Sequence, residues 1–325
     1  MKRNIAIVAG GDSSEHPVSI KSAQTILENM DTSLYEPLIV EIENKRWEAV
    51  LTDGHRVPID RNDFSYSINN KKVVFDYAYI IVHGTPGENG IFEGYLKLVG
   101  IPFSTCDVLA SALTFNKFML NQFLKSFGVR VADSILLRKG NTISATNIQE
   151  RLGLPCFIKP TAGGSSFGTT KVKTREQIEP AIASAFNESD EVIIESFIKG
   201  VELTCGYFKT KKREIALPIT QVMPKTEFFD FEAKYKGMAE EITPAPISDD
   251  LRDRVQKLTA AIYDIVGCRG IVRNDYIISE GNVINLLEVN TTPGMTPTSF
   301  IPQQIRAAGM NMKDVLTEII EDSFD

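Results

Sequence analysis

The sequence has few of the residues that mark several large classes of protein. It has four cysteines, and the nearest two, Cys156 and Cys205, are 49 positions apart, which is not the spacing of a metal or redox motif. Such sparse cysteine is typical of a reducing compartment rather than of a disulfide-stabilised secreted domain. Basic residues are not in excess either. The formal net charge is −7, so no broad positive field favours nucleic acid or an anionic membrane.

Long hydrophobic runs are also missing. The longest stretch without a charged residue, 289–305, contains three prolines and cannot cross a bilayer as a helix. The apolar residues 5–9 that follow Lys2 and Arg3 are too few for a signal peptide, and they predict a buried first strand instead. We therefore expect a cytoplasmic protein that binds neither membranes nor nucleic acid.

The pattern of apolar residues predicts an α/β protein with more than one domain. The chain of 325 residues is long enough for two or three domains of about 150 residues each. In the first third, strand patterns alternate with helical spacing, which predicts a doubly wound parallel sheet with helices on both faces. The expected strands are 4–9, 36–42, 73–83 and 101–103, and the expected helices are 18–30, 91–99, 107–113 and 116–127.

The later parts of the chain have a different pattern. In the middle third, one helix lies among four strands, which predicts an antiparallel sheet with helices on one side. The strands are 134–137, 156–159, 168–172 and 192–195, and the helix is 175–186. In the last third, strands at 202–208 and 214–217 precede an irregular stretch, 218–247, whose length predicts a lid or a binding loop. A helix at 248–266, a hairpin at 270–289 and a helix at 312–322 follow.

A glycine-rich loop follows the strand that ends at Lys159. Residues 163–168 contain three glycines and two serines, so their backbone N–H groups could converge on phosphate oxygens. Lys159 would add a positive charge for the same anion. A flexible turn remains the alternative. The loop is neither a Walker motif, because no Gly-Lys-Ser/Thr follows, nor a dinucleotide motif, because a strand rather than a helix follows.

The hairpin 270–289 predicts a metal site. A two-residue turn at Glu280-Gly281 would place Asp275 opposite Leu286 and Arg273 opposite Glu288. Because side chains alternate along a strand, Arg273, Asp275, Glu288 and Asn290 would then share one face. Their oxygen donors suit Mg²⁺ if water and phosphate complete the octahedron. Simple ion pairing of Arg273 on a solvated face is the alternative.

Three weaker features accompany these motifs. Residues 290–299 are rich in turn formers, so their N–H groups and hydroxyls could hold a carboxylate or an oxyanion, or form an ordinary connection. His83 ends a predicted strand, which is a favoured ligand position, although a structural role is open. Glu15 follows a Gly-Gly turn, where it could bind an ammonium or stabilise a helix N-terminus. With Lys117 as a second lysine, the set indicates ATP chemistry.

In these residues the chain resembles the D-alanine–D-alanine ligases of the ATP-grasp superfamily, over almost its whole length. The segments that carry the resemblance are 8–15, 18–19, 83–84, 87–90, 109–113, Lys117, 159–168, 232–235, 267–270 and 287–299. The resemblance implies a three-domain ATP-grasp fold with an N-terminal α/β substrate domain at 1–105, a central ATP-grasp subdomain at 106–199 and a C-terminal ATP-grasp domain at 200–325. The N-terminal domain would contain the parallel sheet, and the two α+β domains would grip ATP.

The resemblance also implies a reaction. ATP would drive the ligation of two D-alanines to D-alanyl-D-alanine, through an acylphosphate intermediate, for peptidoglycan precursor synthesis and cell wall biogenesis. The cofactors would be ATP and two Mg²⁺ ions, with Mn²⁺ as a substitute, and the enzyme would be a homodimer. Water must be kept away from an acylphosphate, which gives the lid its purpose.

Residue roles follow from the same resemblance. ATP would be bound by Lys117, Lys159, Ser166, Glu195, Ser196, Phe197, Ile198, Glu202 and Lys234. Two Mg²⁺ ions would be held by Asp275, Glu288 and Asn290. The substrates would be bound by Glu15, His83, Ser299 and Phe300. The remaining catalytic groups would be Arg273 and the N–H of Gly294 at the oxyanion, and Ser165 and Tyr235 in a triad with Glu15 that closes the lid.

The chain departs from the family pattern in three places. His16-Pro17 follows Glu15 where a charged pair is frequent, Asn89 replaces a frequent aspartate, and Ala162-Gly163 replaces a common Arg-Glu. Tyr235 is what the family shows for dipeptide formation. The alternatives are a D-alanine–D-lactate ligase, another ATP-grasp carboxylate–amine ligase, or a non-catalytic nucleotide-binding sensor on the same fold. A dinucleotide-dependent oxidoreductase is excluded, because the first turn has no Gly-x-Gly motif.

Overall fold

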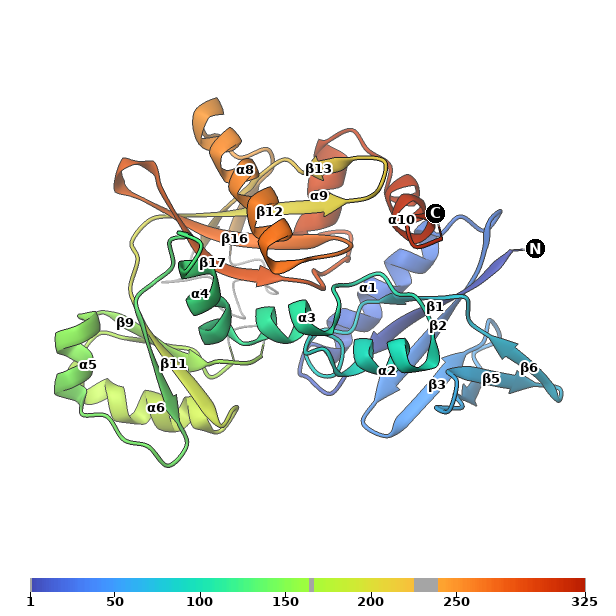
Figure 1. Cartoon of the computed structure of the whole chain (residues 1–325), viewed down its shortest axis with the longest axis horizontal. Coiled ribbons are helices and arrows are strands. Elements are labelled where there is room, and N and C mark those ends of the chain that lie inside the picture. The colour runs from blue at the N-terminus through green and yellow to red at the C-terminus, as the bar shows by residue number, and fades with distance from the viewer. Residues whose placement is uncertain (1, 164–166, 225–238, 325) are drawn as a thin grey trace.

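The computed structural model describes residues 2–163, 167–224 and 239–324 (Figure 1). Three larger sheets and a two-stranded ribbon make up its β structure. Within these residues no helix is both long enough and apolar enough to cross a membrane.

The N-terminal sheet has the strand order β4-β3-β2-β1-β7. Its strands are β1 (Arg3–Gly10), β2 (Tyr35–Glu43), β3 (Arg46–Val50), β4 (Arg56–Pro58) and β7 (Tyr77–Ile80). β1 pairs with β2 and β7 in parallel, as predicted, whereas β3 and β4 extend the sheet in antiparallel fashion. The strands β3 and β4 were not predicted, because their short, mixed sequences show no clear alternation.

Alternate residues of β1 face two different helical layers. Ile5 and Ile7 belong to the core that includes α1 (His16–Asn29) and the C-terminal helix α10 (Met312–Glu321). Their neighbours Ala6 and Val8 pack in a second core with α2 (Ile91–Val99). The parallel centre of the sheet is therefore covered by helices on both faces, which confirms the α/β prediction for this part of the chain.

The predicted strand 73–83 is wrong in its extent. Its first residues belong to β6 (Lys71–Val74), which pairs only with β5 (Ser65–Ile68) in the separate ribbon. Asp76 separates β6 from β7, because its carboxylate accepts a hydrogen bond from Asn4 N at 2.7 Å and its own N–H donates to Asn4 O. His83 lies beyond the end of β7.

The middle sheet is wholly antiparallel, as predicted, and has the strand order β10-β9-β11-β8. Its strands are β8 (Ser134–Arg138), β9 (Cys156–Pro160), β10 (Thr170–Val172) and β11 (Glu191–Ser196). Two helices, α5 (Ala145–Leu152) and α6 (Ile178–Phe186), pack on one side of it and share its apolar core (Figure 1). A short 3-10 turn, Arg175–Gln177, precedes α6, and α5 was not predicted.

The C-terminal sheet has the order β15-β14-β12-β16-β17, with β13 added beside β12. Its strands are β12 (Val201–Lys209), β13 (Glu214–Ala216), β14 (Thr220–Pro224), β15 (Ala239–Ile242), β16 (Val272–Ser279) and β17 (Val283–Asn290). The remaining helices are α3 (Val108–Phe115), α4 (Lys117–Lys125), α8 (Asp249–Val266) and α9 (Phe300–Ala307). The strands β14 and β15 fall at the edges of the stretch 218–247, which was predicted to be irregular.

Two apolar cores cross between parts of the chain that are distant in sequence. One joins Ile5 and Ile7 of β1 to Phe208 of β12 and to Ile301 of α9. Another joins α3 and α4 to β12, β16 and α8. The N-terminal sheet and the C-terminal sheet are thus packed together. The domain boundaries at 105/106 and 199/200 stay a prediction.

Gly270 marks a close approach between two of these parts. Its φ is +65°, and an added Cβ would lie 1.8 Å from the carbonyl oxygen of Ser104. No side chain fits there, so the segment before β16 is held directly against the segment that follows the N-terminal sheet. Gly267 has a similar φ of +73° but nothing within 4 Å of the same position.

We predict that Gly270→Ala destabilises the protein more than Gly267→Ala. Both variants place a Cβ on left-handed backbone, which costs about 1–2 kcal/mol. Only Gly270→Ala must also move Ser104, which adds about 1–3 kcal/mol of overpacking. Urea unfolding of both variants measures the difference. Equal free energies of unfolding would contradict the close approach.

Candidate active site

Two pockets lie side by side at the ends of the C-terminal strands. The polar pocket is lined by Glu15, Val18, His83, Glu88, Thr114, Phe115, Lys117, Gly163, Glu241, Arg273, Glu288, Val289, Asn290, Thr291, Gly294, Thr296, Thr298, Ser299 and Phe300. The apolar pocket is lined by Lys117, Ala132, Phe157, Lys159, Pro160, Ala162, Gly163, Phe167, Thr169, Glu195, Ser196, Ile198, Glu202, Asp275, Ile277, Asn285, Leu286, Leu287 and Glu288. Lys117, Gly163 and Glu288 line both, so the two pockets meet there.

The hairpin of β16 and β17 supplies charged groups to both pockets, but its predicted register is wrong. The turn has three residues, Glu280–Asn282, so Ser279 pairs with Val283. If this register continued along the whole hairpin, Asp275 would lie opposite Leu287, and Glu288 would point to the opposite side of the sheet from Asp275. A bulge between Tyr276 and Asp275 leaves Leu287 without a partner and removes this offset.

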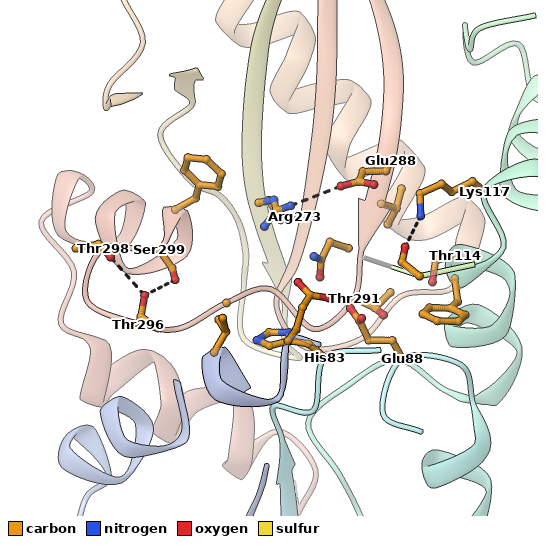
Figure 2. Close-up of a pocket in the computed structure, with 18 of the residues that line it drawn as sticks. His83, Glu88, Thr114, Lys117, Arg273, Glu288, Thr291, Thr296, Thr298 and Ser299 are labelled. Carbon is orange, nitrogen blue, oxygen red and sulfur yellow. Dashed lines mark hydrogen bonds and ion pairs between the residues drawn. The ribbon is translucent and has the colours of Figure 1, made fainter. Parts of the chain in front are cut away.

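The bulge restores the predicted face. Asp275 lies opposite Glu288, and Arg273 lies opposite Asn290. Directly opposed residues of an antiparallel pair project to the same side, so all four side chains share one face. Arg273 donates to both oxygens of Asp275, at 2.9 and 2.8 Å, and lies 3.8 Å from Glu288. Figure 2 shows Arg273 and Glu288 side by side above His83 and Glu88.

Oxygen donors for a metal are present on this face but do not form a complete site alone. Asp275 and Glu288 are an opposed carboxylate pair, and Asn290 adds an amide oxygen one pair further along. In the described residues no group of three or more His, Cys, Asp or Glu side chains gathers into a metal site. The donors present fit a Mg²⁺ ion only if ligand oxygens and water complete its coordination.

The lysines predicted to bind phosphate lie beside the glycine-rich loop. Lys117 Nζ donates to Gly163 O at 2.6 Å, so it reaches the start of this loop from α4. Lys159, at the end of β9, forms a buried ion pair with Glu195, with 2.5 Å between Nζ and Oε2. Asn121 donates to the other oxygen of Glu195 at 2.9 Å. The side chain of Lys159 is thereby held in the wall of the apolar pocket.

Most residues predicted to surround a nucleotide line the apolar pocket. Glu195, Ser196, Ile198 and Glu202 lie there, together with the rings of Phe157 and Phe167. Phe197 is not among the lining residues. Its ring packs on Phe157 with centroids 6.1 Å apart, and Lys171 lies 4.2 Å above it. Phe197 lies one residue beyond the end of β11, so the alternation of that strand does not fix the direction of its side chain.

The polar pocket brings together the residues predicted to bind substrate. Glu15 is the N-cap residue of α1, and His83 lies across the loop that follows β7. Burial lowers the pKa of His83, although Glu15 opposes that shift. The Nε2 atom of His83 has no hydrogen-bond partner in the part of the chain that the structure describes. His83 therefore contributes an imidazole whose burial favours the neutral form to the wall of the polar pocket.

The turn before α9 forms another wall of the same pocket. Ser299, the N-cap residue of α9, shares a hydrogen bond of 2.7 Å with Thr296 (Figure 2). A Cβ on Gly294 would lie 3.0 Å from Ser299 Oγ, so the glycine allows the backbone to approach this hydroxyl. Phe300 lies under Arg273, with 5.4 Å between Cζ and the ring centroid. The predicted residues Gly294, Ser299 and Phe300 thus lie in one place.

Four predicted residues lie outside the described residues. They are Ser165, Ser166, Lys234 and Tyr235. The triad of Glu15 with Ser165 and Tyr235 therefore stays a prediction.

The sequence reasoning missed two acids in the polar pocket. Glu88 lies in the segment 87–90 that carries the family resemblance, and its place in a loop after a strand could have indicated a role. Glu241 lies in the stretch that was predicted to be irregular, so no periodic signal pointed to it. Burial raises the pKa of Glu88 to about 8, and Glu15 adds to the rise, although Gly84 N donates to Glu88 at 2.6 Å.

We predict that Glu88 is protonated near neutral pH. The infrared spectrum of the wild type minus that of Glu88→Gln should show a protonated carboxyl band that titrates with a midpoint near pH 8. In a Glu15→Gln background the midpoint should fall, because the charge that disfavours ionisation is gone. A spectrum that shows Glu88 fully ionised at neutral pH would contradict the assignment. Glu93, whose pKa burial raises to about 7, should keep its own band in every variant.

Comparison with known proteins agrees with this geometry. Residues 4–106 match the family model described as D-ala D-ala ligase N-terminus, and residues 123–321 match the model of the C-terminus of the same ligases. The chain is 61% identical over 324 residues to a D-alanine--D-alanine ligase of Phocaeicola vulgatus, with 100% of both chains covered. It is 52% identical over 322 residues to one of Porphyromonas gingivalis, covering 99% of this chain and 98% of that protein.

Two solved structures are similar over their full length. The VanG D-Ala:D-Ser ligase of Enterococcus faecalis matches with a TM-score of 0.88 at 28% identity, covering 99% of this chain and 100% of that one. A D-alanine--D-alanine ligase of Bacillus anthracis complexed with ATP matches with a TM-score of 0.78 at 29% identity, covering 99% and 97%.

Proposed function

The chain belongs to the D-alanine–D-alanine ligase family, and we propose that it uses ATP to join two D-alanines through an acylphosphate intermediate. The observation that carries this proposal is the meeting of the two pockets at Lys117 and Glu288. A phosphate bound in one pocket and a carboxylate bound in the other can come into contact only at such a junction. The dipeptide product is the building block expected for peptidoglycan precursor synthesis.

The apolar pocket suits ATP. Its aromatic and aliphatic walls would enclose the adenine beside Glu195, Ser196 and Ile198, and Glu202 would accept from the ribose. Lys159 and Lys117 line this pocket and would neutralise the phosphates. Ser166 and Lys234 would complete the phosphate contacts, as the resemblance implies. The γ-phosphate would then lie near Glu288, at the junction.

Asp275, Glu288 and Asn290 would hold two Mg²⁺ ions, or Mn²⁺, once ATP supplies the remaining oxygens. The metal would supply positive charge that offsets the negative charge of the phosphates. The opposed pair of Asp275 and Glu288 supports this assignment, because both carboxylates face the same side of the hairpin. Arg273 beside them would stabilise charge on the transferred phosphoryl group and on the later oxyanion.

The polar pocket suits the two amino acids. Glu15 would receive the ammonium of the first D-alanine, with His83 beside it, and the carboxylate of that D-alanine would attack the γ-phosphate. Ser299 and Phe300 would hold the carboxylate of the second D-alanine, whose amine attacks the acyl carbon. Arg273 and the N–H of Gly294 would then stabilise the tetrahedral oxyanion. The triad of Glu15 with Ser165 and Tyr235 would close the lid.

The cofactor requirement and the thiols are consistent with a cytoplasmic location. The reaction consumes ATP, which is made and kept inside cells. All four cysteines are free and buried, as expected of a chain in a reducing compartment.

We predict that phosphate release from ATP strictly requires D-alanine and Mg²⁺, and that the product has the mass of D-alanyl-D-alanine. L-alanine should not replace D-alanine. Asp275→Asn and Glu288→Gln should each lower turnover by about 100-fold or more, since each removes a carboxylate proposed to hold the metal that offsets the charge of the phosphates. Asp253→Asn, on the exposed side of α8, is the control and should behave as the wild type.

Two results would overturn the proposal. Tight ATP binding without any release in the presence of D-alanine would favour a nucleotide-binding sensor. Ester formation from D-lactate at least as fast as dipeptide formation would favour a D-alanine–D-lactate ligase.

We also propose a homodimer formed through α2 and α3. Apolar side chains are exposed there, with Ile91 at 62%, Leu98 at 88% and Leu109 at 78% exposure. Ile91 and Leu98 are two helical turns apart and so lie on one face of α2. Such a concentration of exposed apolar residues on neighbouring helices is typical of a subunit interface.

We predict that sedimentation velocity gives about twice the monomer mass of 36.1 kDa for the wild type. Leu98→Glu should give monomers, because it buries a charge in the interface. Leu34→Glu, at an exposed apolar position elsewhere, should remain dimeric. A monomeric wild type, or a dimeric Leu98→Glu, would contradict this interface.

A further inference from the structure

Glu241 brings a carboxylate into the polar pocket that neither the motifs nor the resemblance assigns. It lies on β15, opposite Val222 of β14. Its side chain is half-buried and lines the pocket together with Arg273, Ser299 and Phe300. Of these neighbours, Ser299 and Phe300 are the groups proposed to bind the second D-alanine.

Gln303 of α9 holds this carboxylate in place. Its Nε2 donates to Glu241 Oε2 at 2.6 Å and to Thr298 O at 2.7 Å. The backbone N–H of Gln303 also donates to Ser299 O at 3.2 Å. Glu241 is therefore tied to the same turn that carries Ser299. Its other oxygen, Oε1, has no hydrogen-bond partner among the residues that the structure describes.

Among the described residues, no close ion pair neutralises the charge of Glu241. Burial raises its pKa, and the hydrogen bond from Gln303 and the attraction of Arg273 oppose that rise. Arg273 makes its two short contacts with Asp275 rather than with Glu241. A ligand that brings a positive group to Oε1 would therefore gain a charge-assisted hydrogen bond in a partly desolvated place.

We propose that Glu241 binds the ammonium group of the second D-alanine and thereby selects an amino acid over a hydroxy acid. This inference rests on the proposed function. D-Lactate differs from D-alanine in having a neutral hydroxyl where D-alanine has an ammonium. A carboxylate distinguishes the two by charge, whereas Ser299 and Phe300 meet parts of the substrate that both molecules share. Glu241 is then a specificity-determining residue of the second subsite.

The test is Glu241→Gln, which keeps the size of the side chain and removes its charge. Loss of one hydrogen bond to a charged group should lower kcat/KM for the second D-alanine by about 10- to 100-fold. Turnover with D-lactate as second substrate should be unchanged or higher, so the ratio of dipeptide to ester should fall in a competition assay. The KM for ATP should not change.

Glu240→Gln is the matched control. It removes the same charge from the preceding residue of β15, whose exposed side chain points to the opposite face. It should keep the wild-type ratio of dipeptide to ester. Glu241→Asp keeps the charge and should retain a preference for D-alanine. Gln303→Leu leaves the charge but frees the carboxylate, so its ratio should fall between those of the wild type and Glu241→Gln.

The proposal would be overturned if Glu241→Gln gave the same product ratio as Glu240→Gln. It would also be overturned if Glu241→Gln lost D-alanine and D-lactate turnover equally, since a merely structural role has that effect. If Glu241→Gln did not fold, the ratios of Glu241→Asp and Gln303→Leu would decide. A wild type that makes no dipeptide at all would contradict the proposed function instead, independently of Glu241.

Discussion

The pairing of β16 with β17 is the constraint on which the site depends. Within one hairpin, it places a cation, two carboxylates and an amide on the same face, between the two pockets. The bulge at Leu287 is essential to this arrangement, because the three-residue turn alone would direct Glu288 to the other side of the sheet. A local irregularity of the backbone thus decides which groups can act together.

Around this face, groups from distant parts of the chain are held by shared cores. Glu15 and His83 follow strands β1 and β7 of the N-terminal sheet. That sheet is joined to the C-terminal sheet by the apolar cluster around Ile5, Phe208 and Ile301. Lys117 comes from α4, which packs on the other side of the C-terminal sheet. The pocket walls are therefore positioned by burial of apolar surface, and polar groups add local orientation.

Much of this arrangement could be predicted from the sequence, and the limits have physical reasons. The face of the hairpin followed from the alternation of side chains, but its register did not, since the same sequence allows a turn of two or three residues. Periodicity could not show that β3 and β4 join the first sheet. Phe197 was assigned to the nucleotide with its neighbours, but its ring packs on Phe157 and is not among the residues that line the pocket. Glu241 was not predicted as a site residue because it lies within a long stretch, 218–247, whose sequence shows no periodicity.

In the proposed mechanism, the shared face of β16 and β17 joins a nucleotide pocket to a substrate pocket. A crystal structure of the protein with Mg²⁺ and a non-hydrolysable ATP analogue is the decisive test of this arrangement. We expect the adenine beside Glu195 and Ile198, and the γ-phosphate near Lys117, with metal bound by Asp275, Glu288 and Asn290. A nucleotide bound outside the apolar pocket, or metal bound without these side chains, would contradict the claim.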